Sequence, residues 1–248
     1  PAREMLAILE RDNLFLVALD DERYWYRYHH LFGDFLRARL EIDSPNLVSS
    51  LHRRAARWYA ARSATDDAIH HALAAPDYDL AAALIARTYP AMLQRGEVMT
   101  LKSWVESLPS RIRRSDPVLM LAYAWTRAVT LDVEDMEDCL EELAQRIDSA
   151  PDISPEDRAG LRGELLTIRA SRAFPMGDME ATVQYAEEAL AQLPDAHGVV
   201  RSVVAHTRAN AYQFLGKMEA SADAYGQAIA AGRRAGNHFI AFSGTVNL

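Results

Sequence analysis

Few residues of this sequence have the types and spacing that chemistry requires. Two adjacent histidine pairs, His29-His30 and His70-His71, are the most conspicuous. Neighbouring residues of a helix point about 100° apart, so neither pair alone can place two nitrogens on one metal ion. We therefore expect His70 and His71 to pack between helices and to cap them.

Cys139 is the only cysteine of the chain. A lone cysteine forms neither a disulfide framework nor a thiolate metal cluster, and this usage is typical of a reducing, cytoplasmic compartment. We expect the side chain to be a small buried hydrophobe rather than a nucleophile.

The two lysines, Lys102 and Lys217, do not complete a phosphate-binding loop. Gly216-Lys217 is followed by Met218 instead of serine or threonine, and Ala211 occupies the place of the loop's upstream glycine. The metalloprotease motif HExxH and the hydrolase motif GxSxG are also absent from the sequence. Because no nucleophile–base pair can be named, we predict that this chain is not an enzyme, with no catalytic residues and no metal ligands.

Composition narrows the class of protein. The chain has 248 residues, of which 50% are hydrophobic, and a formal net charge of −8. The apolar fraction is enough for a core, while the acidic balance argues against nucleic acid as a direct partner. No apolar run of the sequence approaches the roughly 20 residues of a membrane helix. Because the sequence begins at Pro1 without a methionine, we expect it to be a piece of a longer protein.

The elements that position His29 and His30 read as a β-hairpin followed by a helix. The apolar run Leu14–Leu19 and the aromatic run Tyr24–Tyr28 flank a charged turn, which is the pattern of two short strands. From His30 onward apolar residues recur every three or four positions, as in an amphipathic helix. With the amphipathic segment Ala2–Arg11 ahead of them, these elements predict the latter half of a winged-helix domain. Three acidic side chains in the turn do not suit a DNA-binding wing.

After this segment the chain reads as helices alone. Three helix starts combine a capping residue with proline at the first helical position. They are Ser44-Pro45, Asp116-Pro117 and Ser154-Pro155. Pro90 is expected to bend or split the helix that Gly96 ends as a left-handed cap.

A repeat becomes visible in the C-terminal half. Gly177 and Gly216 are 39 residues apart, and each lies between two helical stretches. The spacing around Gly216 matches a tetratricopeptide repeat, although the period is longer than the usual length of about 34. A degenerate earlier copy is expected over Val118–Ile147. Stacked helix pairs form a superhelix with a concave surface, because one pair cannot bury its apolar face alone. Residues that could contact a ligand there, each more often a core residue, are Tyr123, Trp125, Tyr212 and Gln213.

Three stretches of sequence carry a resemblance to a known family. They are Asn13–Leu16, Trp25–Phe32 and Ala68–Leu73. Together with Gly96 and Trp104 they resemble the MalT-like group of large ATP-binding regulators in the LuxR family. The WYRYHHLF motif at 25–32 is the most specific part, and the looser repeats extend the resemblance over nearly the whole chain.

The resemblance implies a mainly α fold in which a tetratricopeptide-like superhelix follows the hairpin and helix of a winged-helix domain. Residues 1–43 would be the C-terminal part of the winged helix, 44–116 a helical arm, and 117–248 a truncated superhelical sensor. The upstream P-loop domain and the C-terminal helix-turn-helix of such regulators are not in this sequence. No cofactor is therefore expected in this fragment, while ATP or ADP is implied for the full-length protein.

The resemblance also implies partners. They are the protein's own upstream nucleotide-binding domain, a small-molecule or protein inducer on the superhelix, further copies of the full protein, and DNA through the helix-turn-helix only. A membrane partner is not expected.

One cofactor-binding residue, His29, follows from the same resemblance. In related ATPases a histidine at the start of the last winged-helix helix touches the β-phosphate of ADP and holds the closed state, and the motif places His29 there. A histidine at a helix N-terminus can donate to a phosphate, and the helix dipole favours the anion. The alternative is that His29 caps the helix or hydrogen-bonds within the hairpin.

Two functions remain open at this point. The first is a regulatory and sensor fragment of an ATP-dependent LuxR-family transcriptional regulator, in which nucleotide and inducer shift the population between closed and self-associating, DNA-binding states. The second is a helical-repeat scaffold that binds protein partners without a nucleotide switch. The winged-helix signature favours the first function, because a bare scaffold has no need of it.

Overall fold

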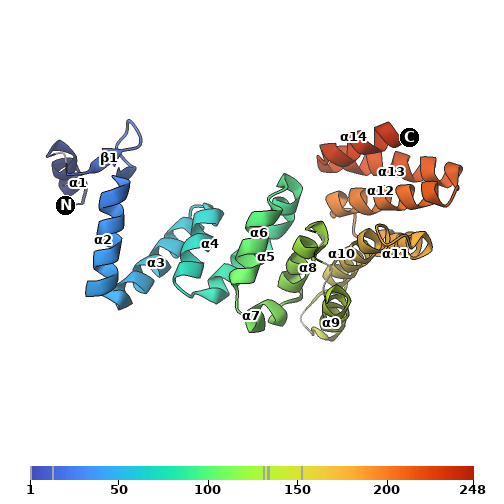
Figure 1. Ribbon diagram of the computed structural model, residues 1–248, viewed down its shortest axis with the longest axis horizontal. Coiled ribbons are helices and arrows are strands. Elements are labelled where there is room, and N and C mark those ends of the chain that lie inside the picture. Colours follow the sequence, from blue (N-terminus) through green and yellow to red (C-terminus); the bar gives the residue numbers. More distant parts are fainter. Residues whose placement is uncertain (1, 13, 131, 133–134, 152) are drawn as a thin grey trace. The chain divides into compact units, whose positions relative to one another are not determined.

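The computed structural model describes residues 2–12, 14–130, 132, 135–151 and 153–248, and it divides into an N-terminal unit (1–77) and a C-terminal unit (78–248). The described residues form helices and one two-stranded sheet (Figure 1). In chain order they are α1 (Ala2–Arg11), β1 (Leu16–Ala18), β2 (Tyr26–Tyr28), α2 (His30–Asp43), α3 (Pro45–Ala60), α4 (Thr65–Ala74), α5 (Tyr78–Arg95), α6 (Val98–Ser107), α7 (Ser110–Ser115), α8 (Pro117–Val129), α9 (Met136–Ser149), α10 (Pro155–Ala173), α11 (Met179–Gln192), α12 (Gly198–Phe214), α13 (Met218–Ala235) and α14 (His238–Asn247). The predicted mainly α fold with an N-terminal hairpin is confirmed.

The hairpin of the N-terminal unit has shorter strands than the apolar runs indicated. β1 and β2 pair in antiparallel register, with Leu16 opposite Tyr28. Phe15 has a positive φ of 58°, which an extended strand does not allow, so β1 begins only after it. The Asp20 carboxylate closes the turn by accepting a hydrogen bond from the backbone N–H of Trp25 at 2.8 Å.

Three helices complete the N-terminal unit. α2 starts at His30 as predicted, and Pro45 is the first residue of α3. The predicted serine cap of α3 is wrong: in the described part of the chain the Ser44 side chain makes no capping hydrogen bond, and its ψ of 62° differs from the extended value usual for such a residue. α3 and α4 form a helical hairpin. Its buried seam consists of Ala56, Ala68, Ile69 and Ala72.

One kind of turn ends several helices of the C-terminal unit. A glycine with φ between 70° and 82° follows α5, α10, α12 and α13 in turn, at Gly96, Gly177, Gly216 and Gly236. At Gly216 the glycine N–H donates to Gln213 (3.0 Å) and the next N–H, of Lys217, donates to Tyr212 (2.9 Å). These two bonds satisfy carbonyl groups that the helix end leaves free. The structure thus places both glycines of the predicted repeat between paired helices.

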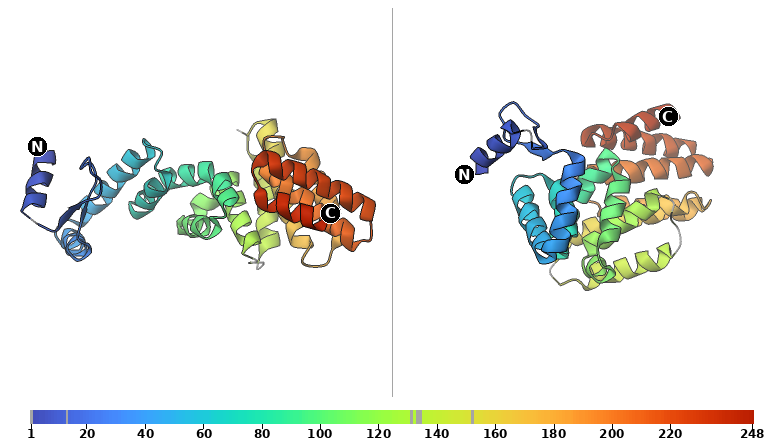
Figure 2. Two further views of the ribbon diagram at one scale, coloured as in Figure 1. Left: turned by 90° about the horizontal axis from the view of Figure 1, so that it is seen from above. Right: turned by 60° about the vertical axis from the view of Figure 1, so that its left-hand side comes forward.

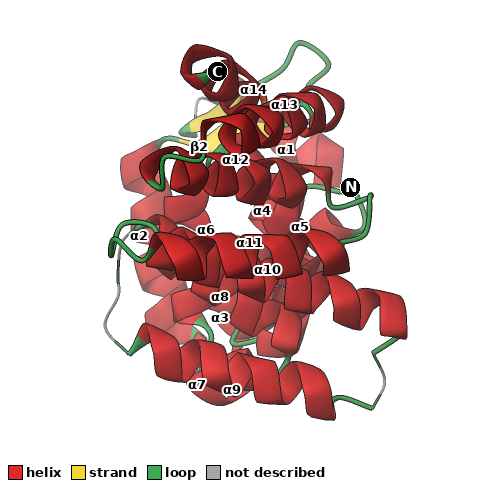
Figure 3. Ribbon diagram, turned by 90° about the vertical axis from the view of Figure 1, so that its right-hand side faces the viewer, coloured by secondary structure: helices red, strands yellow, loops and turns green. Residues whose placement is uncertain are grey.

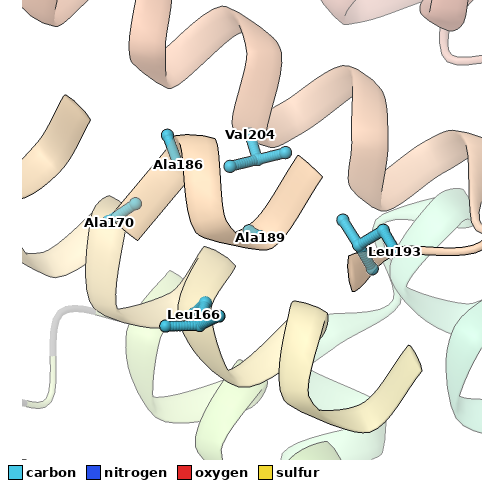
Figure 4. Close-up of a cluster of buried hydrophobic side chains, with 6 residues drawn as sticks. All are labelled: Leu166, Ala170, Ala186, Ala189, Leu193 and Val204. Atoms are coloured by element: carbon cyan, nitrogen blue, oxygen red, sulfur yellow. The ribbon is translucent and has the colours of Figure 1, made fainter. Parts of the chain in front are cut away.

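Successive helix pairs pack through small and aliphatic side chains. Figure 4 shows six of them meeting between α10, α11 and α12: Leu166, Ala170, Ala186, Ala189, Leu193 and Val204. Alanine lets two helices approach closely, which is why it recurs at matching places of the repeat. The following helices α12, α13 and α14 continue as antiparallel layers (Figures 2 and 3).

Arginines near the start of one helix pair tie down the end of the preceding helix. Arg201 of α12 donates to the carbonyl oxygens of Leu190 (3.1 Å) and Leu193 (2.5 Å) at the end of α11. Arg158 of α10 donates in the same way to Ala150 (2.7 Å), after α9. A cation at a helix C-terminus also suits the helix dipole. These hydrogen bonds hold neighbouring helix pairs together without burying further apolar surface.

Two local expectations need correction. α5 runs unbroken through Pro90, so the predicted split is wrong; buried Ile85, Tyr89 and Met92 on the same helix supply packing that outweighs one lost backbone hydrogen bond. The short helix α7 was not predicted.

The boundary between the compact units falls inside the proposed arm, and the division into 1–43, 44–116 and 117–248 stays a prediction. Among the described residues, no helix combines the length and apolar character needed to cross a membrane.

Candidate functional site

His29 lies where the backbone turns from the hairpin into α2. Its N–H donates to the carbonyl oxygen of Phe15 at 2.6 Å, and its own carbonyl oxygen accepts from the N–H of Gly33 at 2.9 Å. Within the described residues its imidazole makes no capping hydrogen bond; the ring is exposed, with its centre 4.4 Å from that of His30. The hairpin therefore fixes the backbone of His29 and leaves the imidazole accessible.

The N-terminus of α2 is suited to an anion. The helix has 14 residues, and its first turn contains no acidic side chain that would repel a negative group. The first backbone N–H groups of a helix lack intrahelical acceptors, and the dipole adds positive potential there. An imidazole at the same end can donate a further hydrogen bond. The assignment of His29 as a phosphate contact stays a prediction.

The C-terminal unit holds a second polar site, around the buried carboxylate of Glu164 on α10. Its residue is 4% exposed. Trp125 Nε1 of α8 donates to Glu164 Oε2 at 2.9 Å, and the Tyr89 hydroxyl of α5 donates to the same oxygen at 3.3 Å. The Nδ1 atom of His197, the residue before α12, lies 3.1 Å from Oε1. One side chain thus connects four helices.

The electrostatics of this site follow from that geometry. The hydrogen bond with Glu164 raises the pKa of His197, against the opposing effect of burial, and the charge of Glu164 adds to the rise. Burial raises the pKa of Tyr89 well above its ordinary value, and Glu164 contributes to this shift. A carboxylate is an acceptor only, and the three neighbouring groups use most of its roughly four acceptor positions. The site is an anchor for the fold, since the buried carboxylate contacts side chains from three other elements.

The other sequence-predicted contacts lie mostly in packing positions. Trp125 is buried with its N–H on Glu164. The Tyr212 hydroxyl donates to Glu187, and Gln213 accepts from the hydroxyl of Tyr225. The Arg113 guanidinium lies 4.3 Å from the ring centre of Tyr123. The structure therefore joins these residues to the protein's own helices.

The remaining reactive groups lie in different surroundings. Cys139 on α9 is half-buried, and burial raises the pKa of its thiol, which disfavours the nucleophilic thiolate. His71 packs between α3 and α4, where its Nδ1 atom meets that of His52 at 2.8 Å. His70 is exposed. Among the described residues, no group of three or more metal-binding side chains comes together.

Comparison with known proteins identifies the N-terminal segment. Residues 1–48 match the family model described as the MalT winged helix domain. The chain is MalT-like. Over 213 residues it is 29% identical to the HTH-type transcriptional regulator MalT of Klebsiella pneumoniae (strain 342), an alignment that covers 86% of this chain and 23% of that protein.

Two further relatives show how far the likeness extends. The MalT protein of Cronobacter sakazakii is 30% identical over 195 residues, which is 79% of this MalT-like chain and 21% of the relative. The serine/threonine-protein kinase PknK of Mycobacterium tuberculosis H37Rv is 32% identical over 168 residues, or 68% of this chain and 15% of the kinase. The chain therefore spans less than a quarter of the length of these relatives. No solved structure matches it.

Proposed function

We propose that this MalT-like chain is the regulatory and sensor segment of an ATP-dependent transcriptional regulator of the LuxR family, acting in the cytoplasm. It couples nucleotide state and inducer binding to a DNA-binding activity that resides in another part of the protein. The match of residues 1–48 to the MalT winged helix, with His29 exposed at the start of α2, supports this proposal.

The mechanism is a population shift between two states. ADP on the nucleotide-binding domain, held in part by His29, stabilises the closed monomer. An inducer bound to the helical repeats favours the open state, which self-associates and binds DNA. A ligand shifts such an equilibrium only by the difference of its affinities for the two states, so His29 must contact the nucleotide in one state alone.

The test is a titration of ADP into the longer protein that contains the nucleotide-binding domain. We expect His29→Ala to weaken ADP binding roughly 10- to 150-fold, because a hydrogen bond to a charged group contributes about 1.5–3 kcal/mol. It should also raise the fraction of self-associated protein in the presence of ADP, measured by analytical ultracentrifugation.

His30→Ala is the matched control, since His30 is the exposed neighbour on the same helix. It should leave ADP affinity within about twofold of the original. Unchanged affinity in His29→Ala would remove His29 from the proposal. A longer protein that contains neither a nucleotide-binding domain nor a helix-turn-helix would overturn the proposed function as a whole.

A scaffold without a nucleotide switch is the second candidate function. The observation that favours it is the likeness to PknK, a relative named as a kinase rather than as a regulator of transcription. A helical segment shared by two such proteins would serve each by binding a protein partner. Nucleotide-independent binding of one partner, unaffected by His29→Ala, would favour this function over the first.

A further inference from the structure

Two histidines on neighbouring helices of the N-terminal unit form one hydrogen-bonded pair. Nδ1 of His52 on α3 lies 2.8 Å from Nδ1 of His71 on α4, and the ring centres are 5.0 Å apart. The second distance exceeds the first by about two ring radii, so each nitrogen points nearly straight at the other. Two nitrogens bound to one tetrahedral zinc ion would lie about 3.3 Å apart and point at the metal instead. The geometry is that of a shared proton.

The number of protons on this pair decides whether it holds together. One imidazole donates its N–H and the other accepts, so the pair needs a single proton between the two Nδ1 atoms. The two neutral rings can take up one further proton at an outer Nε2 without losing this bond. Protons on both Nδ1 atoms set two N–H groups against each other, and two positive charges as well once both rings are charged. The bond between α3 and α4 then has to break.

The pair is the end of a chain of ring contacts that leads back to the hairpin. His71 stacks on Tyr59 with ring centres 5.4 Å apart, and Tyr59 contacts Trp58 at 4.9 Å. Trp58 in turn meets Trp25, at the end of the hairpin turn, edge-on at 5.8 Å. A movement of His71 therefore changes the surface on which Trp25 rests.

The groups around His71 oppose a further proton on its imidazole. Burial and the charges of His52 and His70 lower the pKa of His71 below its ordinary value of 6.5, while the carboxylate of Asp67 raises it in part. From α2, Arg37 and Glu41 line the same cavity as the two imidazoles, one charge of each sign.

We propose that His52 and His71 act as a pH-sensitive switch that couples the helical hairpin α3–α4 to the β-hairpin. With a single proton between the two Nδ1 atoms, the pair joins the two helices and holds the ring chain to Trp25 in place. Because the folded-state pKa of His71 is depressed, this stabilisation is present above 6.5 and is lost as the pH falls through the lowered value.

Fluorine NMR of the full chain, labelled with fluorotryptophan, tests the switch. The four tryptophans give separate signals, which Trp25→Phe and Trp58→Phe assign. Between about pH 7.5 and about pH 5 the signals of Trp25 and Trp58 should shift together. The midpoint pH of this shift should equal that of the proton NMR signals of the His71 ring. Trp104, outside the ring chain, is the internal control and should not follow that midpoint. Circular dichroism confirms that the chain stays folded over the range.

Matched variants decide the origin of the shift. His71→Gln and His52→Gln should each abolish the common transition of Trp25 and Trp58, because either removes the shared proton. His70→Gln should keep the transition and move its midpoint upward, since His70 only adds repulsion. A transition that persists in both His52→Gln and His71→Gln, or signals of Trp25 and Trp58 that do not change in the original protein, would overturn the proposal.

Discussion

Replacing the buried Glu164 by leucine should destabilise the C-terminal unit. The substitution leaves the buried N–H of Trp125 and the buried hydroxyl of Tyr89 without their acceptor. Each such loss costs about 1–3 kcal/mol, so the two cost about 2–6 kcal/mol. Leucine regains about 1.5–2 kcal/mol through apolar burial. The middles of the two ranges give an expected net loss of about 2 kcal/mol.

Glu164→Gln separates charge from shape. Glutamine keeps one acceptor oxygen but turns an amide N–H group toward a donor, which should cost about 1–2 kcal/mol. The raised pKa of His197 adds a pH dependence. The His197 pair contributes stability fully below pH 6.5, and that part is lost as the pH rises through the raised folded-state value. The difference in stability between the original protein and Glu164→Gln should therefore narrow as the pH rises from 6.5 through the raised pKa of His197.

Urea unfolding followed by circular dichroism measures both effects. The two compact units need not unfold together, so each transition is fitted by itself. Glu187→Leu is the matched control, because the exposed Glu187 also accepts from a tyrosine hydroxyl, that of Tyr212. It should change the free energy of unfolding by no more than about 0.5 kcal/mol. A Glu164→Leu protein as stable as the Glu187→Leu control would refute the anchoring role of Glu164.

Two further predictions concern turns and caps. Gly216→Ala should cost about 1–2 kcal/mol of stability, because alanine is strained at a φ of 74°. Gly226 lies mid-helix with open space around it, so Gly226→Ala should stabilise the protein by about 0.5–1 kcal/mol. Thermal unfolding of both variants measures the contrast, and equal shifts of the melting temperature would contradict it. Asp116→Ala should cost about 1 kcal/mol of stability, because the Asp116 carboxylate caps α8 by accepting from the N–H of Val118 at 2.8 Å. Ser44→Ala should change stability little, because the Ser44 side chain makes no capping hydrogen bond. Urea unfolding measures both, and similar losses of stability at the two sites would contradict the prediction.

Local signals in the sequence predicted the elements well, because the physics behind them is local. Asp116 and Ser154 cap helices that begin at the next residue, as their side-chain chemistry indicated. The hairpin and the start of α2 follow from the change of apolar period near His30. Ser44 shows the limit of such reasoning, since the residue type allows a cap and only the backbone conformation decides whether it forms.

The side-chain pairings of the two polar sites required more than local signals. Along the sequence, His52 precedes and His71 follows, by the same number of residues, the point between residues 61 and 62, where the α3–α4 hairpin turns back. A helical hairpin brings together positions at equal distances on either side of its turn. The partner of His71 is therefore His52 on the opposite helix rather than its neighbour His70. The equal spacing of the two histidines from the turn can be read from the sequence once both helices have been assigned.

Trp125 and Glu164 follow a different rule. They are 39 residues apart, the same interval as between Gly177 and Gly216, so they occupy equivalent places in successive helix pairs. Stacked repeats set equivalent places side by side, and a buried glutamate one period after a tryptophan is a pairing that the period alone could have suggested.

Tyr89 and His197 follow neither mirror nor period. Tyr89 is 75 residues from Glu164 and comes from α5, which precedes the repeats, while His197 lies in the turn before α12. No interval in the sequence distinguishes them from other tyrosines and histidines. Their approach to Glu164 depends on how α5 packs on α8 and α8 on α10, which is set by many apolar side chains at once. A carboxylate buried by repeat geometry needs several donors, and where no repeat supplies them they come from whatever elements the tertiary packing brings near.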